Sequence, residues 1–203
     1  MSVEIRRENH HSLTEYAGIS SAYEVREVAY PLALGVPALP LPRVVATASS
    51  CKHYDAIPGN HPRDWPAQFA IDQARFLGAY GARRRVGGAV VIVASADAVR
   101  LGGNSGFALL WDVRVAPDVR GRGVGRVLLG AAEECARDAG AGGMVVETQS
   151  INVVACELYA RAGYEITKVD ADAYPELPGE VQVIWTKTFE VSAPSGGLHS
   201  RRR

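Results

Sequence analysis

The stretch VRGRGVGRVLLGAAEECARDAG, residues 119–140, sets three glycines between arginines directly before an amphipathic run. Apolar residues recur there at helical spacing on one face: Val124, Val127, Leu128, Ala131, Ala132 and Cys135. This periodicity predicts a helix to about residue 139, and Gly140 suits the left-handed residue that ends a helix. The solvent face is expected to hold the polar residues Arg126, Glu133, Arg137 and Asp138. The glycine turn before the helix needs its own explanation.

That turn combines bare backbone with positive charge. The first N–H groups of a helix lack an internal acceptor, and the helix dipole adds partial positive charge there. Because glycine has no side chain, an anion can approach such a backbone closely. The sequence therefore predicts a phosphate or pyrophosphate site made by Arg120, Gly121, Arg122, Gly123, Val124, Gly125 and Arg126. A tight turn that needs glycine only for its dihedral angles is the simpler alternative.

Two familiar nucleotide loops fit this turn poorly. A Walker loop needs Lys-Ser/Thr after its last glycine, whereas Arg126-Val127 follows here. A dinucleotide fingerprint needs GxGxxG directly after a strand, but Arg126 stands in place of the third glycine and residues 117–120 intervene. Glu147 lies near the position of that fingerprint's acidic residue. A nicotinamide-dependent oxidoreductase therefore stays as an alternative.

The turn also matches a third pattern. RGRGVG, residues 120–125, fits the (Q/R)-x-x-G-x-(G/A) signature of the GNAT superfamily of N-acetyltransferases. LLWDVRVAPDVRGRGVGRVLL (109–129) resembles the family's strand-turn-helix, and NVVACELYARAGYE (152–165) resembles its later helix. The resemblance covers about residues 74–189. Within the family, ETQSINVVACELYARAGYEI (147–166) and DADAYPELPGEVQVIWTKTF (170–189) resemble the streptothricin acetyltransferases.

The resemblance implies an acetyl-CoA-dependent N-acetyltransferase that acts directly on an amine of a small molecule, such as the antibiotic streptothricin. A non-catalytic CoA-binding module is a further alternative. The resemblance also implies that the backbones of Val113 and Val115 pair with the pantetheine arm of the cofactor, and that Asn152 contacts it. An N-cap role fits Asn152 equally well, since it opens the predicted helix.

The same resemblance makes Tyr159 the candidate proton donor to the leaving thiolate. A tyrosine hydroxyl with a pKa of about 10 can donate to a group that titrates near about 8.5. The alternative is a core aromatic on one helical face. Asp112 and Glu147 are candidate bases for the ammonium substrate, which must lose a proton before it attacks, and a water chain with no single base is the alternative. Cys156 lacks an evident base partner, and we interpret it as a packing residue.

Strands and helices alternate along the chain. We expect strands at 23–30, 74–81, 86–95, 107–116, 143–149, 164–169 and 181–189, and a second helix at 152–162. This order predicts a mixed α/β fold, and the resemblance implies a GNAT-like, mostly antiparallel sheet flanked by helices, with a splayed central strand pair. Residues 1–190 are expected to form a single domain with a loose start at 1–12, followed by a disordered tail at 191–203.

The proline-rich residues 31–45 and the aperiodic residues 52–69 are expected to be irregular and to set specificity. A cationic amine is attracted to carboxylates and aromatic faces. The candidate acceptor-binding residues are Tyr54, Asp55, Asp64, Trp65 and Tyr174.

Composition narrows the partners. The 203 residues carry a formal net charge of zero, so no global field draws the protein to nucleic acid or membrane. The three cysteines form no CxxC and no ligand spacing with histidine, and no metal site is expected. Their odd number and the polar N-terminus favour reduced thiols in the cytoplasm. A monomer or homodimer is expected.

Overall fold

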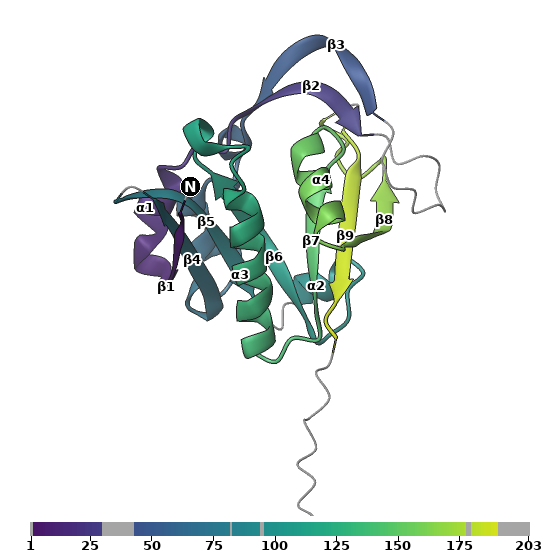
Figure 1. Ribbon diagram of the computed structural model, residues 1–203. Helices are drawn as coiled ribbons and strands as arrows, with labels where there is room; N and C mark the ends of the chain where they lie inside the picture. Colours follow the sequence, from purple (N-terminus) through teal and green to yellow (C-terminus); the bar gives the residue numbers. More distant parts are fainter. Residues whose placement is uncertain (1, 30–42, 82, 94–95, 178–179, 191–203) are drawn as a thin grey trace, which may run out of the picture.

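The computed structural model describes residues 2–29, 43–81, 83–93, 96–177 and 180–190. The main sheet has seven strands in the order β1-β4-β5-β6-β7-β9-β8, and β2 and β3 form a second sheet (Figure 1). In chain order the strands are β1 (Glu4–Glu8), β2 (Tyr23–Ala29), β3 (Arg43–Lys52), β4 (Ala74–Gly81), β5 (Arg84–Ile92), β6 (Phe107–Val115), β7 (Gly143–Gln149), β8 (Glu165–Asp170) and β9 (Gln182–Thr188). The helices are α1 (Leu13–Ala17), α2 (Ala96–Arg100), α3 (Val124–Asp138) and α4 (Val153–Arg161), and short 3-10 turns include η2 (Tyr54–Ala56), η3 (Pro62–Ala67) and η5 (Pro117–Val119).

The main sheet is mixed but mostly antiparallel. Every neighbouring pair of its strands runs antiparallel except β6 and β7, which are parallel and joined through α3. This arrangement confirms the predicted fold class.

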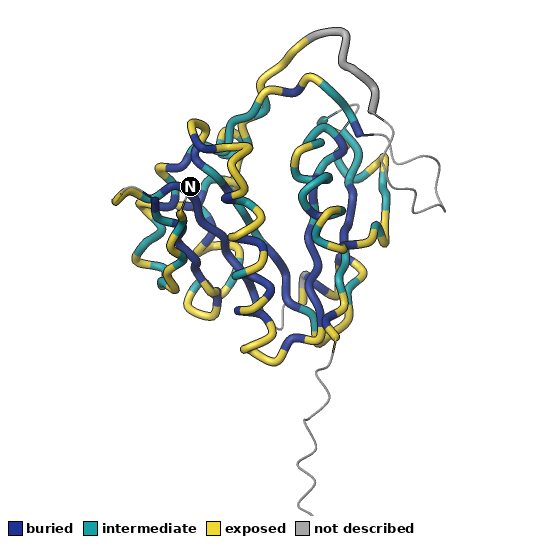
Figure 2. Tube along the Cα trace, viewed as in Figure 1, coloured by how far each residue is buried: buried dark blue, intermediate teal, exposed yellow. Residues whose placement is uncertain are grey.

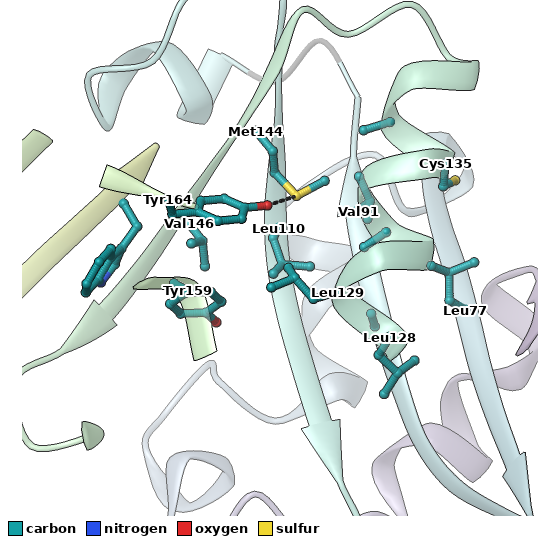
Figure 3. Packing of buried hydrophobic residues seen from close by; sticks show 14 of the residues in the cluster. Leu77, Val91, Leu110, Leu128, Leu129, Cys135, Met144, Val146, Tyr159 and Tyr164 are labelled. Carbon is teal, nitrogen blue, oxygen red and sulfur yellow. Dashed lines mark hydrogen bonds between the residues drawn. The ribbon is translucent and has the colours of Figure 1, made fainter. Parts of the chain in front are cut away.

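Both faces of the main sheet are covered. Successive residues on a strand point to opposite faces, and Leu110 and Val146 accordingly join one buried cluster while Leu109 and Val145 join another. The first cluster contains the buried apolar residues of α3 and α4 (Figure 3). The second contains Tyr16 of α1 and Trp65 of η3. The central strands are therefore buried along most of their length (Figure 2).

The parallel pair β6 and β7 separates after a short contact. Their pairing runs only from Phe107↔Gly143 to Leu109↔Val145. A register shift against β5 follows at Trp111, the extra residue between Leu110 and Asp112. Beyond it the strands diverge between α3 and α4, and β2 and β3 arch across the open end (Figure 1). The predicted splayed pair is therefore present.

Helix α3 follows the predicted apolar stripe with two differences. Val127 is 44% exposed, whereas the neighbouring Leu129 is buried. Glu133, predicted on the solvent face, is buried because Lys187 bonds its carboxylate at 2.9 Å and Arg137 adds an ion pair at 3.1 Å. Gly140 has φ of 83°, which confirms the predicted helix stop.

Other differences lie in the first half of the chain. Residues 4–8, predicted to be loose, form β1 because their backbone pairs with the edge of β4. Residues 43–52 form β3 opposite β2, although 43–45 were predicted to be irregular. The rest of the predicted irregular segment 31–45, and the predicted tail, lie outside the described residues. Among the described residues, no helix is both long enough and apolar enough to cross a membrane.

Candidate active site

The glycine turn lies at the N-terminus of α3, where β6 ends. Gly121 and Gly123 have φ values of 74° and 84°, a conformation that side chains disfavour. A Cβ on either would meet no atom within 4 Å. Gly125 has no positive φ, and a Cβ there would make ordinary contacts with Leu158 and Val115. The backbone dihedral angles thus explain why glycine occupies two of these three positions. The space around Gly121 and Gly123 also leaves the turn open to a ligand.

The amides of this turn are free to bind an anion. Val127 is the first residue of the helix whose N–H donates inside it, to the Gly123 carbonyl at 3.2 Å. In the described part of the chain, the N–H groups of residues 121–126 have no acceptor. Such groups at a helix start favour phosphate oxygens. The turn therefore fits a phosphate-bearing ligand.

The arginines of the turn differ in their engagement. Arg120 donates from all three nitrogens to carbonyls, those of Val115 at 2.9 Å, Ala22 at 2.6 Å and Ser20 at 2.8 Å. Arg122 and Arg126 are exposed and form no ion pair within the described ranges. They also line a groove of about 670 Å³ on the side of α3 that faces β1 and β4. Arg122 and Arg126 thus supply the positive charge that is available to a ligand at this turn.

Val113 and Val115 lie on the part of β6 that has no β7 partner. Both are paired with β5, opposite Ala89 and Gly87, and their side chains pack against the buried cluster under α3 and α4. Their edge toward β7 is left without a strand. A ligand that enters the splay can reach that edge, and pairing with pantetheine stays a prediction.

Tyr159 lies in α4 above β7 and is 3% exposed. Its ring centroid lies 5.8 Å from that of Tyr164 and 6.2 Å from that of Trp185. Its hydroxyl points away from Tyr164, toward the side of Leu110 and Leu129 (Figure 3). Burial raises the pKa of this hydroxyl, and the negative charge of Asp112 raises it further. Tyr159 is therefore a neutral hydrogen-bond donor, and it is a core aromatic as well.

Asp112 belongs to a buried ionic cluster on the opposite face of the sheet. It accepts hydrogen bonds from the Tyr16 hydroxyl at 2.8 Å and from Arg114 Nε at 2.7 Å. Arg114 also donates to both carboxylate oxygens of Asp55 at 3.2 Å. Two carboxylates thus share one guanidinium, which leaves one net negative charge. The Asp112 side chain is 24% exposed, so part of that charge can reach a ligand.

Glu147 lies across the splay from Asp112, on β7. It accepts a hydrogen bond from the Tyr174 hydroxyl. Burial and the charge of Glu147 raise the pKa of Tyr174, so this phenol stays protonated. This hydrogen bond joins the predicted base Glu147 to the predicted acceptor-binding residue Tyr174 on the β7 side of the splay.

Tyr54 contacts the β7 side of the splay at the end of that strand. Its hydroxyl donates to the Gln149 amide oxygen and lies 3.5 Å from Asn152 Nδ2. Burial raises the pKa of Tyr54 to about 12. Asn152 caps α4 by accepting from the Ala155 N–H at 3.2 Å, so the N-cap alternative is present in the structure. Its contact with a cofactor stays a prediction.

The remaining predicted residues lie further from the splay. Trp65 is buried and donates to the Asn60 carbonyl, with the Arg114 guanidinium over its ring at 5.7 Å. It therefore supports the ionic cluster from behind. Asp64 is paired with its neighbour Arg63 at 3.7 Å, and no described contact joins it to the residues of the splay.

Cys156 is fully buried, and burial raises the pKa of its thiol to about 12. A thiolate is the nucleophilic form, so this environment suits packing rather than acyl transfer. Among the described residues, no group of three or more His, Cys, Asp or Glu side chains is placed to hold a metal ion.

Sequence reasoning missed Tyr16, Arg114 and Gln149. Arg114 carried a usable signal, because a charged residue in the apolar strand 107–115 needs a buried partner. Tyr16 had no such signal, since it is an ordinary aromatic whose partner Asp112 is far along the chain.

Comparisons with known proteins define the class. Residues 45–164 match the family model described as the acetyltransferase (GNAT) family, and the chain belongs to this family. Membership confirms the resemblance inferred from the glycine turn, and it removes the nicotinamide-dependent alternative.

Individual relatives narrow the comparison. The chain is 39% identical over 87 residues to streptothricin acetyltransferase A of Bacillus subtilis (strain 168), covering 42% of this chain and 50% of that protein. It is 38% identical over 69 residues to streptothricin acetyltransferase of Streptomyces lavendulae, covering 34% and 36%. The match thus spans half or less of the length of these relatives. A Bacillus anthracis str. Ames protein solved in complex with acetyl coenzyme A has the same fold, with a TM-score of 0.69, 22% identity and coverage of 94% and 100%.

Proposed function

We propose that this protein is an acetyl-CoA-dependent N-acetyltransferase that modifies an amine of a small-molecule antibiotic of the streptothricin type. The main support is the splay between β6 and β7. A turn with free amides lies at its α3 side, and Asp112 and Glu147, each held by a hydrogen bond from a neighbouring side chain, lie on its two strands. The relatives named above supply the antibiotic class.

The proposed cofactor-binding residues lie at the glycine turn and along β6. The free amides of residues 121–126, with Arg122 and Arg126 beside them, suit its phosphates. The edge of Val113 and Val115, which has no β7 partner, suits the amides of its pantetheine arm, although the Val115 carbonyl already accepts one hydrogen bond from Arg120 Nε at 2.9 Å. When bound, acetyl-CoA supplies a thioester-activated acetyl group.

Tyr159 is the proposed hydrogen-bond donor to the leaving thiolate on the cofactor side. Its raised pKa keeps the hydroxyl protonated near neutral pH, and a protonated phenol stabilises negative charge that develops on a nearby sulfur atom. Asn152 holds the start of the same helix in place through its cap.

Asp112 and Glu147 are the proposed carboxylates on the acceptor side. An ammonium group must lose a proton before it attacks, and both side chains sit on the strands that border the splay. Tyr16 and Tyr174 hold them in fixed positions through their hydroxyls. Tyr54 and Asp55 complete this side, and Asp64 and Trp65 are assigned an outer, supporting part.

The proposed cellular setting is the cytoplasm, where acetyl-CoA is available and the free thiols Cys51, Cys135 and Cys156 stay reduced. The proposed assembly is a monomer or a homodimer of one domain, residues 1–190.

Mixing the protein with acetyl-CoA and streptothricin tests the proposal. We expect release of free CoA thiol, and mass spectrometry should show one acetyl group added to the antibiotic. Streptothricin with its amines blocked is the control and should give no thiol. Tight CoA binding without thiol release on a broad amine panel would instead identify a non-catalytic CoA-binding module.

A further inference from the structure

The open end of the splay is crossed by the small sheet of β2 and β3. The β2–β3 strap, which we define as residues 19–29 and 43–56, contains both strands of the small sheet and the turn η2. It runs from the side of β6 to the side of β7 (Figure 1). Since Tyr54 and Asp55 belong to it, the position of the strap sets the position of two proposed acceptor residues.

Several hydrogen bonds and an ion pair hold the β7 end of the strap. The Ala29 N–H donates to the Ser150 carbonyl at 2.8 Å. Lys52 forms a largely buried ion pair with Glu180 at 2.7 Å. Tyr54 donates to Gln149, the last residue of β7. This end of the strap is therefore bonded to the side of the splay that carries β7 and α4.

The β6 end depends on two arginines. Arg114 bonds the Asp55 carboxylate and donates to the Ile19 carbonyl at 3.2 Å. Arg120 donates to the Ser20 and Ala22 carbonyls and, through Nε, to the Val115 carbonyl at the end of β6. Its guanidinium thus clamps the strap to the strand that precedes the glycine turn.

Arg120 is also the first residue of the glycine turn. We propose that it is a positioning residue, whose side chain couples the cofactor turn to the acceptor-binding strap instead of binding phosphate. Each of its three nitrogens already donates to a neutral carbonyl, whereas Arg122 and Arg126 have no ion pair with any described residue and can meet an anion. Ordering of the turn by a cofactor then orders Tyr54 and Asp55 through one side chain.

This inference rests on the proposed function and predicts a division of labour between neighbouring arginines. Replacing Arg120→Met removes the clamp, and we expect the acceptor KM to rise about 10-fold, the scale of one lost hydrogen bond from a charged donor. We expect the Kd for CoA to change less than about 3-fold, because no phosphate contact is lost. Arg122→Met should give the reverse pattern, with weaker CoA binding and an unchanged acceptor KM.

Arg120→Lys retains the charge but replaces the planar fork by a single ammonium. It should give an acceptor KM between those of the native protein and Arg120→Met. Arg75→Met, at an exposed arginine on β4 that donates to the Gln73 carbonyl at 3.3 Å and forms no ion pair within the described ranges, is the matched surface control and should leave each of these constants unchanged.

A readout independent of turnover separates this inference from the proposed function. Hydrogen exchange of the backbone amides in residues 20–29 should speed up in Arg120→Met and stay native-like in Arg122→Met. If the native protein shows no turnover with any amine, the proposed function fails while this exchange test still decides the role of Arg120. Loss of CoA affinity in Arg120→Met equal to that in Arg122→Met, with unchanged exchange in the strap, would overturn the proposal.

Discussion

Replacing Gly123 by aspartate is expected to weaken CoA binding while leaving the fold intact. Gly123 is the N-cap of α3 and has φ of 84°. The left-handed conformation costs a side chain about 1–2 kcal/mol, with aspartate near the low end because it tolerates this region, whereas aspartate at an N-cap is worth only about a few tenths of a kcal/mol more than glycine. The partial cancellation leaves a cost of about 1 kcal/mol, so the thermal unfolding temperature should fall by only a few degrees.

The effect on binding has no such cancellation. A carboxylate at this position lies beside the free amides of residues 121–126, where the phosphates are expected. Two unit charges about 5 Å apart repel by about 3 kcal/mol at an effective dielectric constant of about 20. Solvent screening at this exposed turn reduces the repulsion to about 1–2 kcal/mol, which corresponds to a Kd about 10-fold higher.

Gly123→Asn is the matched control, because asparagine has the shape of aspartate, tolerates the left-handed region and carries no charge. The assay is calorimetric titration of CoA into both variants at low and high salt. Aspartate should bind about 10-fold more weakly than asparagine at low salt, and the gap should narrow as salt is added. Equal affinities of the two folded variants at low salt would refute an anion site at this turn.

Further predictions concern other parts of the structure. Tyr159→Phe should lower kcat by about 100-fold or more with the Kd for CoA unchanged, and undiminished turnover would remove this hydroxyl from the mechanism. Gly130→Ala should raise the free energy of unfolding by up to about 1 kcal/mol, since Gly130 is helical and a Cβ there meets no atom within 4 Å; a loss of stability on chemical denaturation would contradict this. Iodoacetamide at pH 8 should label the exposed Cys51 first, because burial raises the pKa of Cys156 to about 12 and leaves little thiolate; fast labelling of Cys156 in the folded protein, seen by peptide mass spectrometry, would show that its burial is wrong.

The periodic elements were predictable because local pattern alone determines them. The apolar stripe that begins at Val124 predicted the start of α3 to within a few residues. The left-handed glycines at 140 and 163 predicted where α3 and α4 end. The strands 74–81 and 143–149 match the structure, since each is a buried apolar run. The signature at residues 120–125, together with the flanking strand-turn-helix and the later helix at 152–165, indicated the family, and the resemblance implied the splayed pair.

The elements that prediction missed depend on distant partners. The charged sequence EIRRE of β1 has no strand pattern, and it forms a strand only because the edge of β4 offers free backbone groups. The sequence pattern predicted Glu133 on the surface. In the structure its carboxylate is buried because Lys187, which is far along the chain, forms an ion pair with it. The cluster around Arg114 combines residues from separate segments, and no local rule reveals such a grouping.

A crystal structure of the protein with CoA bound tests most directly whether the turn at residues 121–126 binds the phosphates of the cofactor. We expect pyrophosphate oxygens within hydrogen-bond distance of the amides of residues 121–126, and the CoA sulfur between β6 and β7 next to the Tyr159 hydroxyl. A CoA molecule seated elsewhere, such as along the α3 groove toward Ile5 and Leu77, with protein side chains closing the splay, would contradict the assignment of this site.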